Sequence, residues 1–265
     1  MTGIVIAILI CAVLLLSHIP ALLTMVVMIM NVLAVYEIFR AANMIHARRL
    51  FYTAMAGAVV VSLIPTSLYE NVLLYVLIGA FLVFIHIMRR CGQCNVTIPV
   101  RICGICILVN LLFKAIPSLR NLEHGFLYLL FAVLSGCMTD VFAYILGKKL
   151  GKHKLAPLIS PKKTVEGSLG GIAGAVLVLF LLGMILEKTG ILHVNYPMLM
   201  LYAVISSIVG QFGDLSMSAV KRCLDVKDYG TLFPGHGGIL DRFDSLLFIA
   251  PFTLLFCRHF GTFLL

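Results

Sequence analysis

The residues best suited to carry chemistry lie between positions 214 and 244, and they include five of the six aspartates in the chain. Asp241 and Asp244 are three positions apart at the start of an apolar run, so a helix would place them on one face. Two such carboxylates can bind a hard cation such as magnesium. The alternative, a cap at a helix N-terminus, accounts for Asp241 but leaves Asp244 without a role.

A second polar group precedes this pair at helical spacing. The residues at offsets 0, 4, 7 and 8 would share one face of a helix that continues the apolar run 196–213, and they are Asp214, Ser218, Lys221 and Arg222. Polar side chains at the boundary of a membrane are costly and usually functional. A solvated helix end would explain one or two of them, but not an acid, a hydroxyl and two cations together.

Glycine-rich and lysine-rich segments complete the polar set. The stretch LFPGHGGI (232–239) cannot form a regular helix, and its glycines would let backbone N–H groups approach an anion, although half of such turns are plain loops. Further upstream, a polar island offers cations and hydroxyls to phosphate through Ser160, Lys162, Lys163 and Thr164. Anchoring on the cytoplasmic side would explain its lysines alone. Together these residues suit phosphoryl or nucleotidyl transfer, which needs metal, cations and close backbone approach.

Two acidic residues lie within apolar runs. Asp140 is either functional or paired with a partner that the sequence does not reveal. Glu37 is three positions from Arg40 near a predicted helix end, which favours a local ion pair.

The composition identifies the elements that must position these residues. The chain of 265 residues is 62% hydrophobic and 12% charged, with a mean hydropathy of +1.10, whereas soluble domains carry about twice that charge. We therefore predict an all-α membrane helix bundle with nine spans. They cover approximately 3–17, 21–39, 53–69, 72–88, 99–116, 126–147, 168–187, 196–213 and 245–263. Residues 1–125 would form a scaffold and 126–265 the catalytic part, with cytoplasmic loops at 148–167 and 214–244.

The basic residues predict the orientation. With the N-terminus in the cytoplasm and the C-terminus outside, 16 of the 20 basic residues fall in cytoplasmic loops. The net charge of +9 is then a property of the cytoplasmic surface and suits anionic lipids or substrates. Nucleic acid is a poorer partner, because the sequence has no soluble basic domain. We expect a multi-pass protein of the cell membrane whose active site faces the cytoplasm.

Four cysteines form two C-x-x-C pairs, Cys91 with Cys94 and Cys103 with Cys106. Such pairs can bind structural zinc, but only eight residues separate them, which is shorter than usual. Unpaired thiols are the favoured alternative.

The stretch SAVKRCLDVKDYGTLFPGHGGILDRFD (218–244) resembles the signature of the phosphatidate cytidylyltransferases, also called CDP-diacylglycerol synthases. The upstream segments DVFAYILGKKLGKHKL and SPKKTVEG are also similar to that family. The resemblance implies transfer of the cytidylyl group of CTP to phosphatidic acid, giving CDP-diacylglycerol and pyrophosphate. It also implies a helical membrane protein, commonly a homodimer, with a centre of magnesium and potassium.

The resemblance also implies roles for individual residues. Asp214, Asp241 and Asp244 would be the metal ligands, and with Lys221 they would form the catalytic set. The other candidate substrate-binding residues are Ser160, Lys162, Lys163, Thr164, Ser218, Arg222, Lys227, His236, Gly237, Gly238 and Arg242.

Two other functions compete with this one. A CTP-dependent lipid kinase would use similar cations but would need a general base for its alcohol. A cation-coupled transporter could use Asp140 and Asp214 as ion sites, yet transporters often have internal repeats, and none is visible here. Release of pyrophosphate that depends on phosphatidic acid distinguishes all three.

Overall fold

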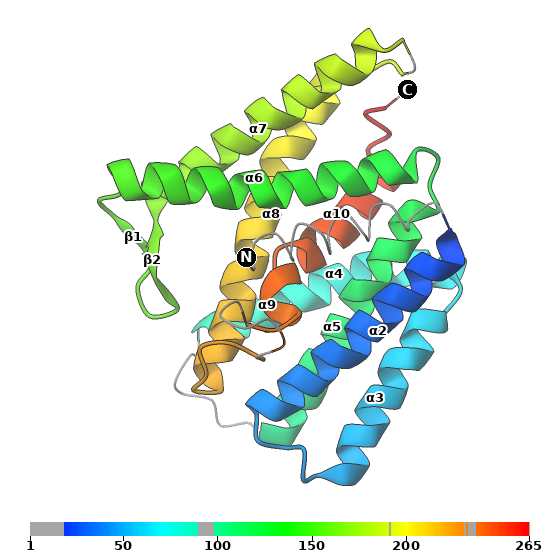
Figure 1. Ribbon diagram of the computed structural model, residues 1–265, viewed down its shortest axis with the longest axis vertical. Coiled ribbons are helices and arrows are strands. Elements are labelled where there is room, and N and C mark those ends of the chain that lie inside the picture. The colour runs from blue at the N-terminus through cyan, green and yellow to red at the C-terminus, as the bar shows by residue number, and fades with distance from the viewer. Residues whose placement is uncertain (1–18, 90–97, 191, 231, 233–236, 265) are drawn as a thin grey trace.

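The structure is a computed structural model, and it describes residues 19–89, 98–190, 192–230, 232 and 237–264. The described chain is mainly helical (Figure 1). Its helices are α2 (Pro20–Ala41), α3 (Arg48–Leu63), α4 (Thr66–Arg89), α5 (Ile98–Arg120), α6 (Gly125–Leu150), α7 (Val165–Lys188), α8 (Tyr196–Cys223), α9 (Leu240–Phe243) and α10 (Leu246–His259).

Six of the described helices, namely α2, α4, α5, α6, α7 and α8, are long and apolar enough to cross a membrane. The protein is therefore a helical, multi-pass membrane protein. The helix α10 is shorter, with 14 residues, and the predicted span 3–17 lies outside the described residues. The count of nine spans remains a prediction.

The predicted span 53–69 is wrong in its bounds. Helix α3 ends at Leu63, and α4 begins at Thr66, so residues 66–69 belong to the next helix. Ile64 is extended, with φ −56° and ψ 135°. The cause is Pro65, because proline disfavours a helical conformation in the residue before it.

The predicted loop 148–167 contains a feature that departs from an all-helical chain. Strands β1 (Lys154–Ala156) and β2 (Ser160–Thr164) pair antiparallel into a small hairpin between α6 and α7. The Glu166 carboxylate accepts the backbone N–H groups of Lys152 and His153, at 3.0 and 3.2 Å, and so fastens the base of the hairpin to α7. The sequence did not predict this hairpin, because its strands are short and contain three lysines. They therefore show no clear alternation of apolar residues.

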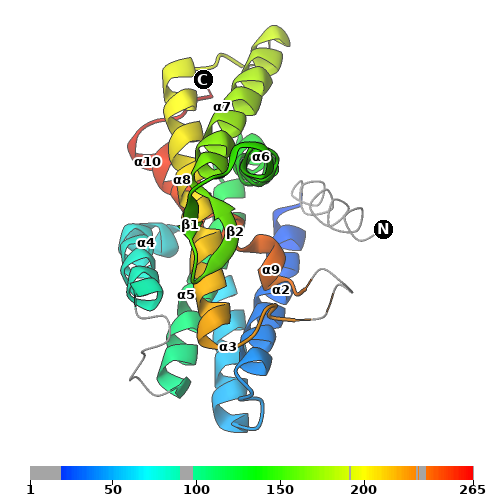
Figure 2. The ribbon, with the colours of Figure 1, turned by 90° about the vertical axis from the view of Figure 1, so that its left-hand side faces the viewer.

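Close helix packing holds the face that carries the polar residues. Helices α6 and α7 cross closely, because a Cβ on Gly171 would lie 2.8 Å from the Thr139 carbonyl oxygen. Two buried hydroxyl pairs then join α6 to α8, Ser135 with Ser206 and Thr139 with Ser207, each at 2.7 Å. Figures 1 and 2 show α7 and α8 beside α6, while α2 and α3 lie together on the other side of α10.

The end of α2, the start of α5 and the end of α8, which the predicted orientation places in the cytoplasm, adjoin at one end of the bundle. A single cavity there is lined by Ala41, Asn43, Arg101 and Asp225, from the end of α2, the start of α5 and the end of α8. The Arg222 Nε donates to the Ile159 carbonyl oxygen at 3.2 Å, which brings the hairpin to the same end of α8. The predicted loop 214–244 itself begins as helix, since α8 continues to Cys223 without a glycine or proline after Gly213.

This clustering leads to a topology prediction. Reporter fusions at positions 45, 95, 155 and 230 should be cytoplasmic, and fusions at 120, 192 and the C-terminus external, because basic loops are retained inside. The measurement is the activity of paired reporters that work on opposite sides of the membrane. A fusion at 155 or 230 on the external side would contradict the orientation and would separate the polar face from cytoplasmic nucleotide.

Candidate active site

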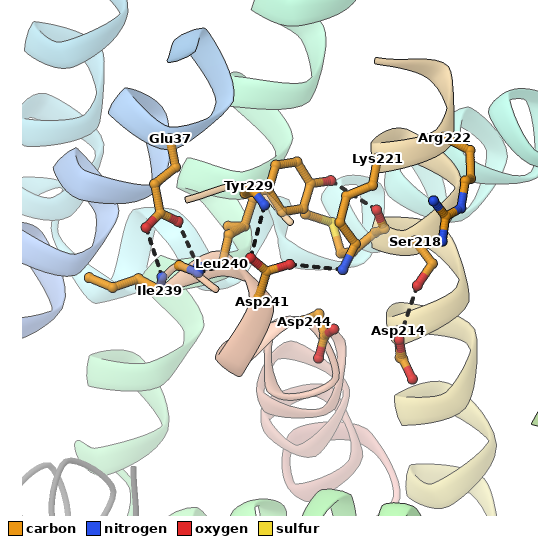
Figure 3. A network of polar contacts seen from close by, with 12 residues as sticks. Glu37, Asp214, Ser218, Lys221, Arg222, Tyr229, Ile239, Leu240, Asp241 and Asp244 are labelled. Carbon is orange, nitrogen blue, oxygen red and sulfur yellow. Dashed lines mark hydrogen bonds and ion pairs between the residues drawn. The ribbon is translucent and has the colours of Figure 1, made fainter. Parts of the chain in front are cut away.

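Asp241 lies at the centre of the polar network. Its Oδ1 accepts from the Lys221 Nζ at 2.8 Å, and its Oδ2 accepts from the backbone N–H of Tyr229 at 2.9 Å (Figure 3). The Oδ2 also accepts from the backbone N–H of Gly238 at 2.9 Å. Only 2% of the Asp241 side chain is exposed. The chain after α8 therefore folds back onto the end of that helix.

Asp244 follows α9, one turn beyond Asp241. Its Oδ1 accepts from the backbone N–H and the hydroxyl of Ser245, at 2.8 and 3.3 Å. Burial raises the pKa of the Asp244 carboxyl well above its usual range, the negative charge of Asp214 raises it further, and Lys221 opposes this. A cation at this position would favour the ionised form.

Asp214 joins the hairpin to α8. Its Oδ2 pairs with the Lys163 Nζ from strand β2, and its Oδ1 accepts from the Ser218 hydroxyl, one turn on, at 3.3 Å. The Asp214 side chain is 20% exposed, so an ion can reach it from solvent. A lysine and a carboxylate that pair in this way can each turn to an incoming phosphate or metal.

Two cavities meet at Asp140. The first, which we call the acidic cavity, has a volume of about 290 Å³, with Asp140, Asp241, Arg242 and Asp244 around it and an apolar wall from α6. That wall comprises Ala132, Val133, Gly136, Cys137 and Val141. The second, which we call the lysine cavity, has a volume of about 510 Å³. It is lined by polar residues that include Asp140, Lys148, Lys162, Lys163, Thr164, Ser168, Gln211 and Asp214.

The chain is similar in sequence to known proteins. The cytidylyltransferase family matches the chain over residues 1–260. The chain belongs to the cytidylyltransferase family. A phosphatidate cytidylyltransferase of Staphylococcus epidermidis is 49% identical over 129 residues, which are 49% of this chain and 48% of the relative. One of Bacillus subtilis is 45% identical over 156 residues, which are 58% and 56%. The chain thus aligns with about half the length of these curated relatives.

The residues of the polar island 160–164 lie in several different places. Lys162 and Lys163 line the lysine cavity. The Thr164 hydroxyl accepts the N–H of Gly167 at 3.1 Å, so it caps α7 as well as lining that cavity. Ser160 lies at the other end of β2, where it pairs with Ala156 in the hairpin.

The candidate residues after α8 differ in what they can offer a substrate. Lys227 is exposed to solvent, and His236 lies outside the described residues. Gly237 has a φ of +82°, a conformation that suits glycine. The N–H of Gly238 already binds Asp241 within the protein. The buried Nε of Arg242 has no hydrogen-bond partner among the described residues, and Arg242 lines the acidic cavity.

Sequence reasoning missed one contact of Glu37 and understated Asp140. The Glu37 carboxylate accepts the N–H groups of Ile239 and Leu240 at 2.8 and 3.0 Å, in addition to the attraction of the Arg40 charge nearby. No sequence signal could have found these partners, because they are backbone groups in a distant segment. Asp140 stood out as an acid in an apolar run, but only the fold shows that it lines both cavities.

Metal binding was predicted at two places. In the described part of the chain, no three His, Cys, Asp or Glu side chains lie close enough to hold one metal ion. The predicted convergence of Asp214, Asp241 and Asp244 on one ion thus stays a prediction, and the donor chemistry fits it, since all three are carboxylates. Of the proposed zinc ligands, Cys103 and Cys106 are free thiols on α5, and Cys91 and Cys94 lie outside the described residues.

Proposed function

We propose that this protein is a phosphatidate cytidylyltransferase, which joins CTP and phosphatidic acid to give CDP-diacylglycerol and pyrophosphate. The observation that carries the proposal is the meeting of the two cavities at Asp140. The lysine cavity has the positive charge that a triphosphate needs. The acidic cavity has an apolar helix wall on one side and Arg242 on the other, which suits a phosphate on an acyl glycerol.

In this proposal the two substrates meet between the cavities. Lys148, Lys162 and Lys163 bind the triphosphate, and Arg242 binds the lipid phosphate. An oxygen of the lipid phosphate attacks the α-phosphorus of CTP, the bond to the β-phosphate breaks, and pyrophosphate leaves with the electron pair. The nucleophile is already ionised at neutral pH, so the chain needs no general base. Positive charge is needed instead, because both substrates are polyanions.

Cations belong to the proposal. Asp214, Asp241 and Asp244 are the proposed ligands for magnesium, with potassium as a second cation. Of the three, Asp241 has the least remaining capacity to bind a cation, because its oxygens already accept three hydrogen bonds. A bound magnesium ion would neutralise part of the triphosphate charge.

The setting of the reaction follows from the same residues. We place the protein in the cell membrane with the polar end of the bundle in the cytoplasm, where CTP is found. Membrane lipids surround it, nucleic acid is not a partner, and a homodimer is the proposed assembly. We keep residues 1–125 as the scaffold part and 126–265 as the catalytic part of this proposal.

A pyrophosphate-release assay on detergent-purified protein tests the activity. We expect pyrophosphate only when CTP, magnesium and phosphatidic acid are all present. Diacylglycerol should not replace phosphatidic acid, because it lacks the phosphate that attacks CTP. Formation of CDP from CTP and a lipid alcohol would indicate the kinase, and no nucleotide turnover at all would favour the transporter.

A further inference from the structure

Glu37 makes a long-range contact that the proposed reaction does not explain. It lies on α2, is only 4% exposed, and accepts the N–H groups of Ile239 and Leu240 (Figure 3). These partners are 202 and 203 residues away in the sequence. Burying a carboxylate costs free energy unless it is hydrogen-bonded. The fold is therefore more stable when Ile239 and Leu240 keep their N–H groups directed at Glu37.

Two glycines leave room for the Glu37 carboxylate. A Cβ on Gly230 would lie 2.7 Å from its Oε1, and a Cβ on Gly238 would lie 2.2 Å from the same atom. Neither glycine has a positive φ. Space, and not backbone conformation, therefore requires glycine at these positions, and the chain wraps around Glu37 on two sides.

The same segment is held from its other side by Asp241, which binds the N–H groups of Tyr229 and Gly238. Gly238 thus donates to Asp241 while its Cα faces Glu37, and Ile239 and Leu240 lead directly into Asp241. Movement of the segment at Glu37 would shift Asp241, and with it Asp244 at the acidic cavity.

We propose that Glu37 is a positioning residue, whose carboxylate holds segment 237–244 so that Asp244 and Arg242 face the acidic cavity. This inference rests on the proposed function for its kinetic effect, but not for its structural effect. Glu37 lines neither cavity, so it acts through the segment that it binds.

Hydrogen exchange and kinetics of Glu37→Ala and Glu37→Gln test the inference. In Glu37→Ala, the amides of Ile239 and Leu240 should exchange about 10-fold faster or more, because they lose a charged acceptor. Turnover should fall about 100-fold, with a higher magnesium concentration at half-maximal rate. Glu37→Gln keeps one acceptor oxygen and should recover part of both effects. Glu123→Gln, at an exposed position, is the matched control and should change neither.

The glycine contact gives a second, independent variant. Gly230→Ala should push the Glu37 carboxylate off its two N–H partners and reproduce the Glu37→Ala kinetics. The double variant Glu37→Ala/Gly230→Ala should be no worse than Glu37→Ala alone, because both changes break one contact. Gly79→Ala is the control, since a Cβ there meets nothing within 4 Å.

Several outcomes would overturn the inference. Unchanged exchange at residues 239 and 240 in Glu37→Ala would do so whatever the activity. Faster exchange together with normal turnover and magnesium dependence would also overturn it. The same holds if the double variant loses turnover by the product of the two single losses. If the wild-type protein releases no pyrophosphate, the proposed function fails, and the exchange data alone then decide whether Glu37 holds the segment.

Discussion

Asp244→Asn should lower turnover by about 100- to 1,000-fold while the protein stays folded. The substitution keeps the size of the side chain and its contact with the Ser245 N–H, but it removes the negative charge at the acidic cavity. Burial already disfavours that charge in the absence of a cation, which is why its loss should not unfold the protein. The measurement is turnover against magnesium concentration, with monodispersity checked by size exclusion.

Asp225→Asn is the matched control for this substitution. Asp225 is exposed and has a φ of 54°, a left-handed conformation that asparagine also adopts. Its turnover and magnesium dependence should stay normal. If Asp244→Asn kept near-normal turnover while Asp225→Asn lost it, the assignment of Asp244 to the site would be wrong, even with the enzyme class correct.

Lys221→Met should reduce both activity and stability. Asp241 would keep its two backbone donors but lose the cationic partner that lies 2.8 Å away, while its side chain is only 2% exposed. Removing one member of a buried ion pair typically costs about 3–5 kcal/mol. We expect a clearly lower melting temperature and a loss of turnover of at least about 100-fold.

A second substitution separates the two effects of Lys221. In Lys221→Met/Asp241→Asn the buried charge is gone, and the asparagine oxygen can still accept from Tyr229 and Gly238. Thermal stability should therefore recover, whereas turnover should not. Lys188→Met, at the exposed end of α7, should match the wild type in both measurements. Recovery of turnover in the double variant would show that Lys221 only balances a buried charge.

The fold was predictable where it depends on hydropathy along the chain. Apolar runs such as 126–147 and 168–187 correspond to α6 and α7, because a helix that crosses lipid must satisfy its own backbone groups. The hairpin was not predictable, since its five-residue strand SPKKT has no apolar alternation. Its shape depends on contacts with other elements, such as Lys163 with Asp214 and Ile159 with Arg222.

The chemistry was predictable from residues that are close in sequence. Segment 218–244 places acids, cations and glycines within one short stretch, and their types alone indicate phosphate and metal chemistry. The sequence by itself therefore determined the membrane class, the family resemblance and the choice of Asp214, Lys221, Asp241 and Asp244 as the candidates for catalysis.

Only the tertiary structure shows which contacts each of these residues makes, and therefore which role it can take. It showed that Asp241 is occupied by three donors, that Asp140 lies between two cavities, and that Glu37 binds a segment two hundred residues away. The physical reason is that the decisive partners are backbone N–H groups and empty space. Every residue except proline carries the same backbone N–H group. The sequence therefore does not indicate which N–H groups a buried carboxylate will bind.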